Sequence, residues 1–150
     1  MLLIGICDDE KGTCTQLENL LYEYGKRHGI HMEVNTWYAG ETLCDFLKNG
    51  STLDMLFLDI GLITTDGIKV GSFIRDELEN METAIVYISS SNNYAMRLFR
   101  IQPLDFLIKP IEPEQIEDVM NRAMKRYIKK NQLFEYYFRG NCFKIPYKDI

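Results

Sequence analysis

The sequence predicts an α/β fold in which five parallel strands form a doubly wound sheet with helices on both faces. Short apolar runs, each long enough for a strand buried on both faces, alternate with stretches whose apolar residues recur at helical spacing. Strands that alternate with helices are joined by right-handed crossovers into a parallel sheet. The 150 residues, 46% of them hydrophobic, suffice for one such domain and a short appendage, but not for a second full domain.

The apolar runs locate the expected strands. Four runs are continuous, whereas the run at residues 32–38 alternates apolar and polar side chains, as an edge strand does. The continuous runs cover residues 2–7, 55–58, 84–88 and 104–108.

Helical spacing locates the segments between the strands. Two long stripes are the clearest, and they predict the core-facing sides of the first and last helices. They consist of Cys14, Leu17, Leu20, Leu21 and Tyr24, and of Ile116, Val119, Met120, Ala123, Met124 and Tyr127. Shorter helical patterns cover residues 41–47, 68–78 and 93–99.

The last twenty residues differ from the rest of the chain. Residues 1–130 carry 20 acidic and 14 basic side chains, whereas residues 131–150 carry 2 and 3. Residues 134–138 are aromatic and β-prone, residues 139–141 have the composition of a turn, and residues 142–145 are expected to return as a second strand. We therefore predict a main domain over residues 1–130, followed by a linker and the start of another unit over residues 131–150.

Composition argues against several classes of protein. The net charge of −5 disfavours a nucleic-acid surface on this chain. The four cysteines form no CxxC pair and lie near neither histidine, so neither a zinc site nor a redox motif is indicated. The first apolar run stops at two aspartates, far short of a signal peptide or a membrane span. We expect a cytoplasmic protein with no membrane partner.

Polar side chains follow four of the predicted strands, at the sheet edge where ligands bind in open parallel α/β folds. Taken singly, each has an ordinary explanation, because acidic residues are favoured in the first turn of a helix and a lysine after a strand usually faces solvent. Their order and placement together are what predict a site. These residues are Asp8, Asp9, Glu10, Asp59, Ser89 and Lys109.

The chemistry expected of this edge is that of a metal ion and a phosphoryl group. Converging carboxylates raise one another's pKa unless a cation offsets them, and Mg²⁺ prefers oxygen ligands together with a phosphoryl oxygen. Lys109 would add a fixed positive charge, and the Pro110 that follows it permits a cis bond that would turn the lysine inward. Ser89 could donate its hydroxyl to a phosphoryl oxygen, and Asp66-Gly67 suits a loop that leads into a helix.

These motifs, in this order, resemble the response-regulator receiver domain of two-component signalling over residues 1–130. The resemblance implies a flavodoxin-like (βα)5 fold with strand order 2-1-3-4-5. Ile63 stands where many relatives carry proline. The matching motifs are Ile6-Cys7-Asp8-Asp9-Glu10, Leu56-Phe57-Leu58-Asp59-Ile60 with Asp66-Gly67, Val86-Tyr87-Ile88-Ser89 and Asp105-Phe106-Leu107-Ile108-Lys109-Pro110.

The resemblance also implies a function and residue roles. Asp59 would accept a phosphoryl group from a sensor histidine kinase, Lys109 and Ser89 would contact that group, and Phe106 would act as the switch aromatic. Side-chain identity at Gly61 and Ser91 would tune the rate of phosphoryl loss. Mg²⁺ would be held by Asp8, Asp9, Asp59 and the backbone carbonyl of Gly61.

The details of residues 93–99 and 103–110 resemble receivers attached to LytTR-type DNA-binding domains, and residues 134–150 resemble the start of such a domain. Under this interpretation the protein is a transcription regulator and not an enzyme, and it contacts DNA only through a C-terminal domain missing from this chain. Whether it forms a homodimer is left open.

The alternative is a vestigial receiver that acts as an interaction module without phosphorylation. An aspartyl-phosphate hydrolase is disfavoured because Gly61 replaces its second carboxylate, and a flavin-binding flavodoxin because no phosphate loop follows the first strand.

Overall fold

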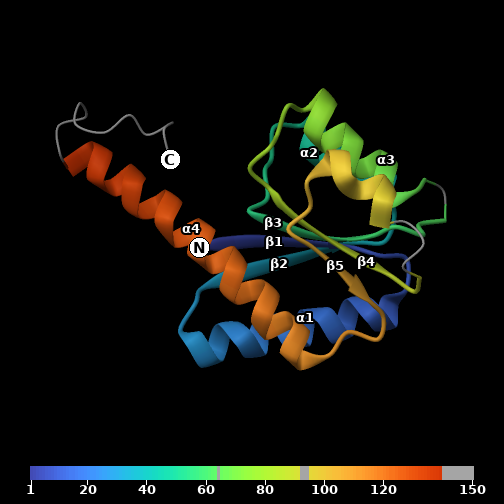
Figure 1. Ribbon diagram of the computed structural model, residues 1–150, viewed down its shortest axis with the longest axis horizontal. Helices are drawn as coiled ribbons and strands as arrows, with labels where there is room; N and C mark the ends of the chain where they lie inside the picture. The colour runs from blue at the N-terminus through green and yellow to red at the C-terminus, as the bar shows by residue number, and fades with distance from the viewer. Residues whose placement is uncertain (64, 92–94, 140–150) are drawn as a thin grey trace.

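Five parallel strands form a single sheet in the order β2-β1-β3-β4-β5, with helices on both faces (Figure 1). The computed structural model describes residues 1–63, 65–91 and 95–139, and the side chains in these ranges except those of 95–97 and 131–139. The strands are β1 (Leu2–Cys7), β2 (Met32–Trp37), β3 (Met55–Asp59), β4 (Ala84–Ser89) and β5 (Asp105–Ile108). The predicted fold class and strand order are therefore confirmed.

The helical segments lie where the apolar stripes predicted them, although two of them are irregular. They are α1 (Lys11–His28), α2 (Gly40–Lys48), α3 (Gly67–Ser72), the π-helical turn η1 (Phe73–Glu77), the 3₁₀ turn η2 (Ala95–Ile101) and α4 (Pro113–Arg139). The helix predicted over residues 68–78 is thus divided between α3 and η1. The helix predicted over residues 93–99 is found as η2, within the described residues.

Each face of the sheet has its own apolar core, because successive strand residues point to opposite faces. One face packs against α1 and α4, and the other packs against α2, α3 and η2 (Figure 1). The strand residues of the first core include Ile4, Phe57 and Val86. Those of the second include Leu56, Ile85 and Tyr87. All of these strand residues are fully buried, as expected for central strands covered on both sides.

The expectation of a β-strand at residues 134–138 is wrong, because α4 continues through them to Arg139. No proline or glycine interrupts the chain between Pro113 and Gly140. Extending an existing helix adds one hydrogen bond per residue, which outweighs the weak β preference of aromatic side chains. Part of the turn predicted at residues 139–141 and all of the predicted strand at residues 142–145 lie outside the described residues. In Figure 1 the C-terminal part of α4 extends away from the sheet.

A buried arginine connects the two irregular turns of the second face. Arg75, in η1, donates from Nε to the carbonyl of Ile101 at 2.8 Å and from Nη1 to the carbonyl of Asn80 at 2.9 Å. Burial lowers the pKa of its guanidinium, so these carbonyl contacts are what compensate the loss of solvent. Arg75 therefore fixes the end of η2 against η1.

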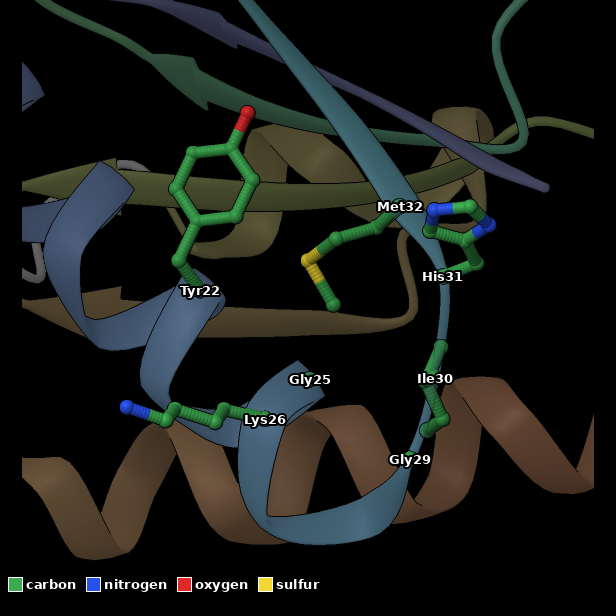
Figure 2. Close-up of a pocket in the computed structure, with 7 residues that line it drawn as sticks. All are labelled: Tyr22, Gly25, Lys26, Gly29, Ile30, His31 and Met32. Atoms are coloured by element: carbon green, nitrogen blue, oxygen red, sulfur yellow. The ribbon is translucent and has the colours of Figure 1, made fainter.

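A shallow hollow of about 540 Å³ lies between the C-terminal end of α1 and the start of β2 (Figure 2). Its lining includes Tyr22, Lys26, His31 and Met32. The Tyr22 hydroxyl also accepts a hydrogen bond from the backbone N–H of Val34, at 3.2 Å, and so covers part of the exposed edge of the sheet. The hollow is at the amino ends of the strands, the edge opposite to the predicted polar site. Within the residues described, no helix combines the length and apolar character that crossing a membrane requires.

Replacing Gly71 with alanine should lower the free energy of unfolding by about 1–3 kcal/mol, measured by urea denaturation. A Cβ at this position would lie 2.0 Å from the Tyr87 hydroxyl oxygen, inside the core between α3 and β4. The same Gly71→Ala change should cost less in a Tyr87→Phe background, since that oxygen is then absent. Gly12→Ala is the matched control, because its Cβ would meet no atom within 4 Å and should not destabilise α1. An equal loss on replacing Gly71 in the parent and in the Tyr87→Phe background would contradict this account.

Candidate functional site

Three aspartates gather at the carboxyl edge of the sheet. Asp59 is the last residue of β3, and Asp8 and Asp9 directly follow β1. Because β1 and β3 are neighbouring parallel strands, their ends bring one oxygen of each carboxylate to within 4.8 Å of the others. Asp8 and Asp59 are buried, with 0% and 5% of their surface exposed, and Asp9 is half-buried. The predicted carboxylate cluster is therefore present.

Lys109 reaches this cluster from β5, at the far side of the sheet. Its Nζ lies 2.9 Å from Asp8 Oδ2, 2.9 Å from Glu10 Oε1 and 3.8 Å from Asp59 Oδ2. Its backbone N–H donates to the carbonyl of Ser89 at 2.8 Å, which attaches the lysine to the end of β4. The Lys109–Pro110 bond is cis, as the sequence allowed. Only 15% of the lysine side chain is exposed, so its charge acts on the cluster with little screening by water.

The pKa shifts at the site arise because groups of like charge are buried close to one another. Burial and the negative charge of Asp8 raise the pKa of Asp59 to about 6, although Lys109 partly opposes them. Burial alone would lower the pKa of Lys109, but its contacts with Glu10 and Asp8 outweigh burial and raise it. Lys109 in turn lowers the pKa of Glu10. The lysine is thus firmly cationic, and the pKa of Asp59 lies closer to neutral pH than that of an ordinary aspartate.

The donor set of the cluster fits a hard divalent cation. All three side chains offer carboxylate oxygens, the ligand type that Mg²⁺ prefers, and a cation would relieve the repulsion that raises the pKa of Asp59. Gly61 lies beside the cluster, where its backbone N–H donates to Asp59 Oδ1 at 3.2 Å. The residues present are therefore suited to hold Mg²⁺.

The two predicted serines lie at the end of β4, next to β3. Ser89 is the last residue of β4 and is buried, and its register position is one step beyond Ile88, the partner of Asp59. The backbone N–H of Ser91 donates to Ser89 Oγ at 3.1 Å and so orients that hydroxyl. Phe106, on β5, is half-buried and packs against the core on the α2 and α3 side of the sheet.

The Asp66-Gly67 motif positions the helix that follows the site loop, as expected. Asp66 Oδ1 accepts a hydrogen bond from the backbone N–H of Lys69 at 2.7 Å and caps α3. Gly67 lies against the main chain of Asp59, where a Cβ would come 2.3 Å from the Asp59 carbonyl oxygen. A side chain at this position would displace the end of β3, so the glycine keeps Asp59 in place.

Sequence reasoning gave no role to Glu10, although the structure makes it a direct partner of Lys109. The only feature of the sequence that points to a role for Glu10 is its position immediately after the two aspartates and before α1. An acidic residue at that position is usually explained by the helix N-terminus. The contact with Lys109 joins residues 99 positions apart, and local sequence does not reveal it.

A five-stranded parallel sheet with three aspartates and one lysine at its carboxyl edge defines a class of protein, and comparison with known proteins identifies it. The response regulator receiver domain family matches residues 4–121. This chain belongs to that family.

The relatives and solved structures agree with this assignment. The transcriptional regulatory protein LytR of Staphylococcus aureus is 32% identical over 118 residues, which are 79% of this chain and 45% of the relative. The sensory transduction protein LytT of Bacillus subtilis is 31% identical over 134 residues, which are 88% of this chain and 50% of the relative. The chain thus spans about half the length of these relatives, whose names confirm the resemblance to LytTR-type regulators.

Two solved structures show the same fold. The response regulatory domain of mrkE from Klebsiella pneumoniae has a TM-score of 0.75 at 21% identity, covering 85% of this chain and 99% of that one. The response regulator TrrA of Thermotoga maritima, solved in complex with Mg²⁺-BeF, has a TM-score of 0.69 at 20% identity, covering 82% and 99%.

The raised pKa of Asp59 should make the contribution of this carboxyl group to the stability of the metal-free protein less favourable at neutral pH than in acid. The folded chain binds this proton more tightly than the unfolded chain, so the unfavourable contribution is absent below about pH 4 and complete above the folded pKa of about 6. Asp59→Asn should raise the free energy of unfolding by about 1–2 kcal/mol at neutral pH in the presence of a chelator.

Urea denaturation at several pH values tests this, with the exposed Asp45→Asn as the matched control. The stability gained by Asp59→Asn should shrink as the pH falls toward 4, and Asp45→Asn should show no gain. A gain of equal size at pH 4 and pH 7 would contradict the proposed cause.

Proposed function

We propose that this chain is a phosphorylation-switched receiver domain whose phosphoacceptor is Asp59. One observation carries the proposal: the Asp59 carboxylate lies at the end of β3, next to two further carboxylates and 3.8 Å from the Lys109 ammonium. Asp59 is the only one of the three aspartates that combines a strand-end position with a contact to this lysine and a hydrogen bond from Gly61.

The donor in the proposed reaction is a phosphohistidine of a sensor histidine kinase. An Asp59 carboxylate oxygen forms a bond to phosphorus while the P–N bond to the kinase histidine breaks, and the electron pair of that bond stays on the imidazole nitrogen. The product is an aspartyl phosphate. Asp59 must be ionised to attack, and its pKa of about 6 leaves most of it in that form at neutral pH.

Asp8, Asp9 and Asp59 would hold Mg²⁺, together with the backbone carbonyl of Gly61. When bound, the ion would neutralise charge on the phosphoryl oxygens and bring them toward the carboxylate. The chain's own contribution is to fix the three carboxylates at the ends of β1 and β3, which are neighbouring strands inside the sheet.

The remaining site residues would respond to the phosphoryl group. Lys109 would bind one phosphoryl oxygen through its ammonium, and Ser89 would donate its hydroxyl to another. Phe106 would turn inward once Ser89 has moved, which changes the surface on the β5 side. Gly61, two residues after the acceptor, and Ser91, two residues after Ser89, would set how readily water removes the phosphoryl group.

The whole protein would be a transcription regulator that binds DNA through a LytTR-type domain following this chain, with residues 131–150 as the linker and the beginning of that domain. The S. aureus relative is named as a transcriptional regulatory protein, and this chain spans 45% of it. The cysteines described, at positions 7, 14 and 44, are free, which fits a reducing cytoplasm. The receiver would act as a switch and not as an enzyme, and homodimerisation is a further outcome that phosphorylation could control.

Asp59→Asn should abolish the phosphoryl-sized mass gain that the parent chain shows with Mg²⁺ and acetyl phosphate. Intact mass spectrometry under native conditions measures this gain, and Asp45→Asn is the control that keeps it. A gain that persists in Asp59→Asn would place the acceptor elsewhere. A parent chain that never gains mass would favour the vestigial interaction module.

Mg²⁺ affinity should depend on Asp9 more than on Asp8. Asp8 is fully buried, and its two oxygens already contact the Lys109 ammonium and the backbone N–H of Glu10. The half-buried Asp9 is thus the more accessible direct ligand of the pair. Calorimetric titration should show roughly tenfold or greater weakening for Asp9→Asn and a smaller effect for Asp8→Asn. Equal losses in two folded variants would contradict this assignment.

A further inference from the structure

We propose that Glu10 is a positioning residue for Lys109. Its carboxylate holds the lysine ammonium at the rim of the acidic cluster and competes for it with the incoming phosphoryl group. The inference rests on the proposed function, because it concerns how readily the same site acquires a phosphoryl group.

The contacts of the ammonium carry this proposal. Lys109 Nζ is 2.9 Å from both Glu10 Oε1 and Asp8 Oδ2, but 3.8 Å from Asp59 Oδ2. An ammonium has three hydrogens to donate, and its two nearest carboxylate oxygens belong to Asp8 and Glu10 and not to the acceptor Asp59. Before transfer the lysine is therefore held on the Asp8 and Glu10 side of the cluster.

Local structure keeps the Glu10 carboxylate in this place. Its backbone N–H donates to Asp8 Oδ1 at 2.8 Å, and the Thr13 hydroxyl donates to the same Oε1 that faces Lys109, at 3.2 Å. Glu10 directly precedes α1, where the free backbone N–H groups of the first turn favour a negative charge. Its position thus depends on the turn between β1 and α1 as well as on the lysine.

The two partners of Lys109 differ in how easily they can be exchanged. The Asp8 side chain is fully buried, whereas 63% of the Glu10 side chain is exposed. A buried carboxylate that loses its partner becomes an unpaired charge without water, but an exposed one is hydrated at once. When a phosphoryl oxygen needs a hydrogen from the ammonium, the Glu10 contact is therefore the one that gives way.

Removing the charge of Glu10 should speed phosphoryl acquisition. With acetyl phosphate as the donor, Asp59 forms its bond to phosphorus while the P–O bond to acetate breaks and acetate keeps the electron pair. Glu10→Gln replaces an ion pair with the ammonium by a weaker contact to a neutral amide, and it removes one negative charge near the anionic donor. Because the Glu10 contact is exposed, the expected increase in rate constant is modest, roughly twofold to fivefold.

The experiment follows the phosphoryl-sized mass gain of the parent chain, Glu10→Gln and Glu23→Gln with Mg²⁺ and acetyl phosphate at low and high ionic strength. Glu23 is an exposed glutamate on α1, about 20 Å from Glu10 along the helix axis, so its variant matches the change in charge but not the position. We expect faster acquisition in Glu10→Gln alone, and a smaller difference at high salt because the contact is screened. Mg²⁺-beryllofluoride should also bind more tightly to Glu10→Gln than to the other two proteins.

The outcomes separate this inference from the function on which it rests. A parent chain that gains no phosphoryl group would overturn the proposed function and this inference with it. A parent chain that reacts normally while Glu10→Gln reacts at the same or a lower rate would overturn the inference alone. Equal acceleration in Glu23→Gln would also overturn it, because the effect would then come from net charge and not from the Lys109 contact.

Discussion

The arrangement of the site depends on one constraint: two buried carboxylates at the ends of neighbouring strands need a cation close by. Asp8 and Asp59 are almost entirely removed from water, and unpaired charges in such surroundings are costly. Lys109 supplies the positive charge from within the chain. It directly follows β5, so its ammonium reaches the cluster only when β4 and β5 have both joined the sheet. The local chemistry of β1 and β3 therefore relies on the complete five-stranded topology.

Residues on the α2 and α3 side of the sheet hold the main chain of the acceptor, Asp59, in place. Gly67 packs against the main chain of Asp59, and the Tyr87 hydroxyl donates to the Gly67 carbonyl at 3.0 Å. Tyr87 is fully buried in β4, and Gly71 leaves the space its hydroxyl occupies. The loop after Asp59 is thus fixed to β4 as well as to α3. This explains why a core tyrosine and two glycines, none of which carries charge, determine where the acceptor carboxylate lies.

The sequence was most informative where the pattern of apolar residues by itself determines whether a segment is a strand or a helix. Apolar runs predicted all five strands to within a few residues, and the polar residues that follow them predicted the cluster of Asp8, Asp9, Asp59 and Lys109. Because the strands are parallel, their carboxyl ends lie at one edge of the sheet. The polar residues that follow the strands could therefore be placed together without knowledge of tertiary contacts. The helical spacing of apolar residues also predicted α3, but it did not predict the π-helical turn η1 that continues it. That irregularity accompanies the packing of Arg75 against Ile101, a contact between distant segments.

The two remaining errors have different physical causes. The aromatic residues 134–138 favour a strand only weakly, and an uninterrupted helix that begins at Pro113 overrides them. Glu10 was seen but given no role, because the local explanation of an acidic residue before a helix is sufficient by itself. Only the folded chain brings Glu10 to Lys109. Local propensity was thus misleading in both places. A continuing helix overrides it at residues 134–138, and a contact with a distant charge overrides it at Glu10.

The lysine also connects the site to the two helices of one face. Glu10 directly precedes α1, and Lys109 lies four residues before the start of α4, so the contact between them joins the beginnings of both helices. The C-terminal end of α1 is joined separately to the N-terminal part of α4, through Arg27 and Glu117 at 2.6 Å and through the Tyr24 hydroxyl and Asn121 at 2.7 Å. A phosphoryl group that takes the ammonium from Glu10 would release only the first of these connections. The contacts of Arg27 and Tyr24 do not involve Lys109, so they would keep the C-terminal end of α1 packed against α4.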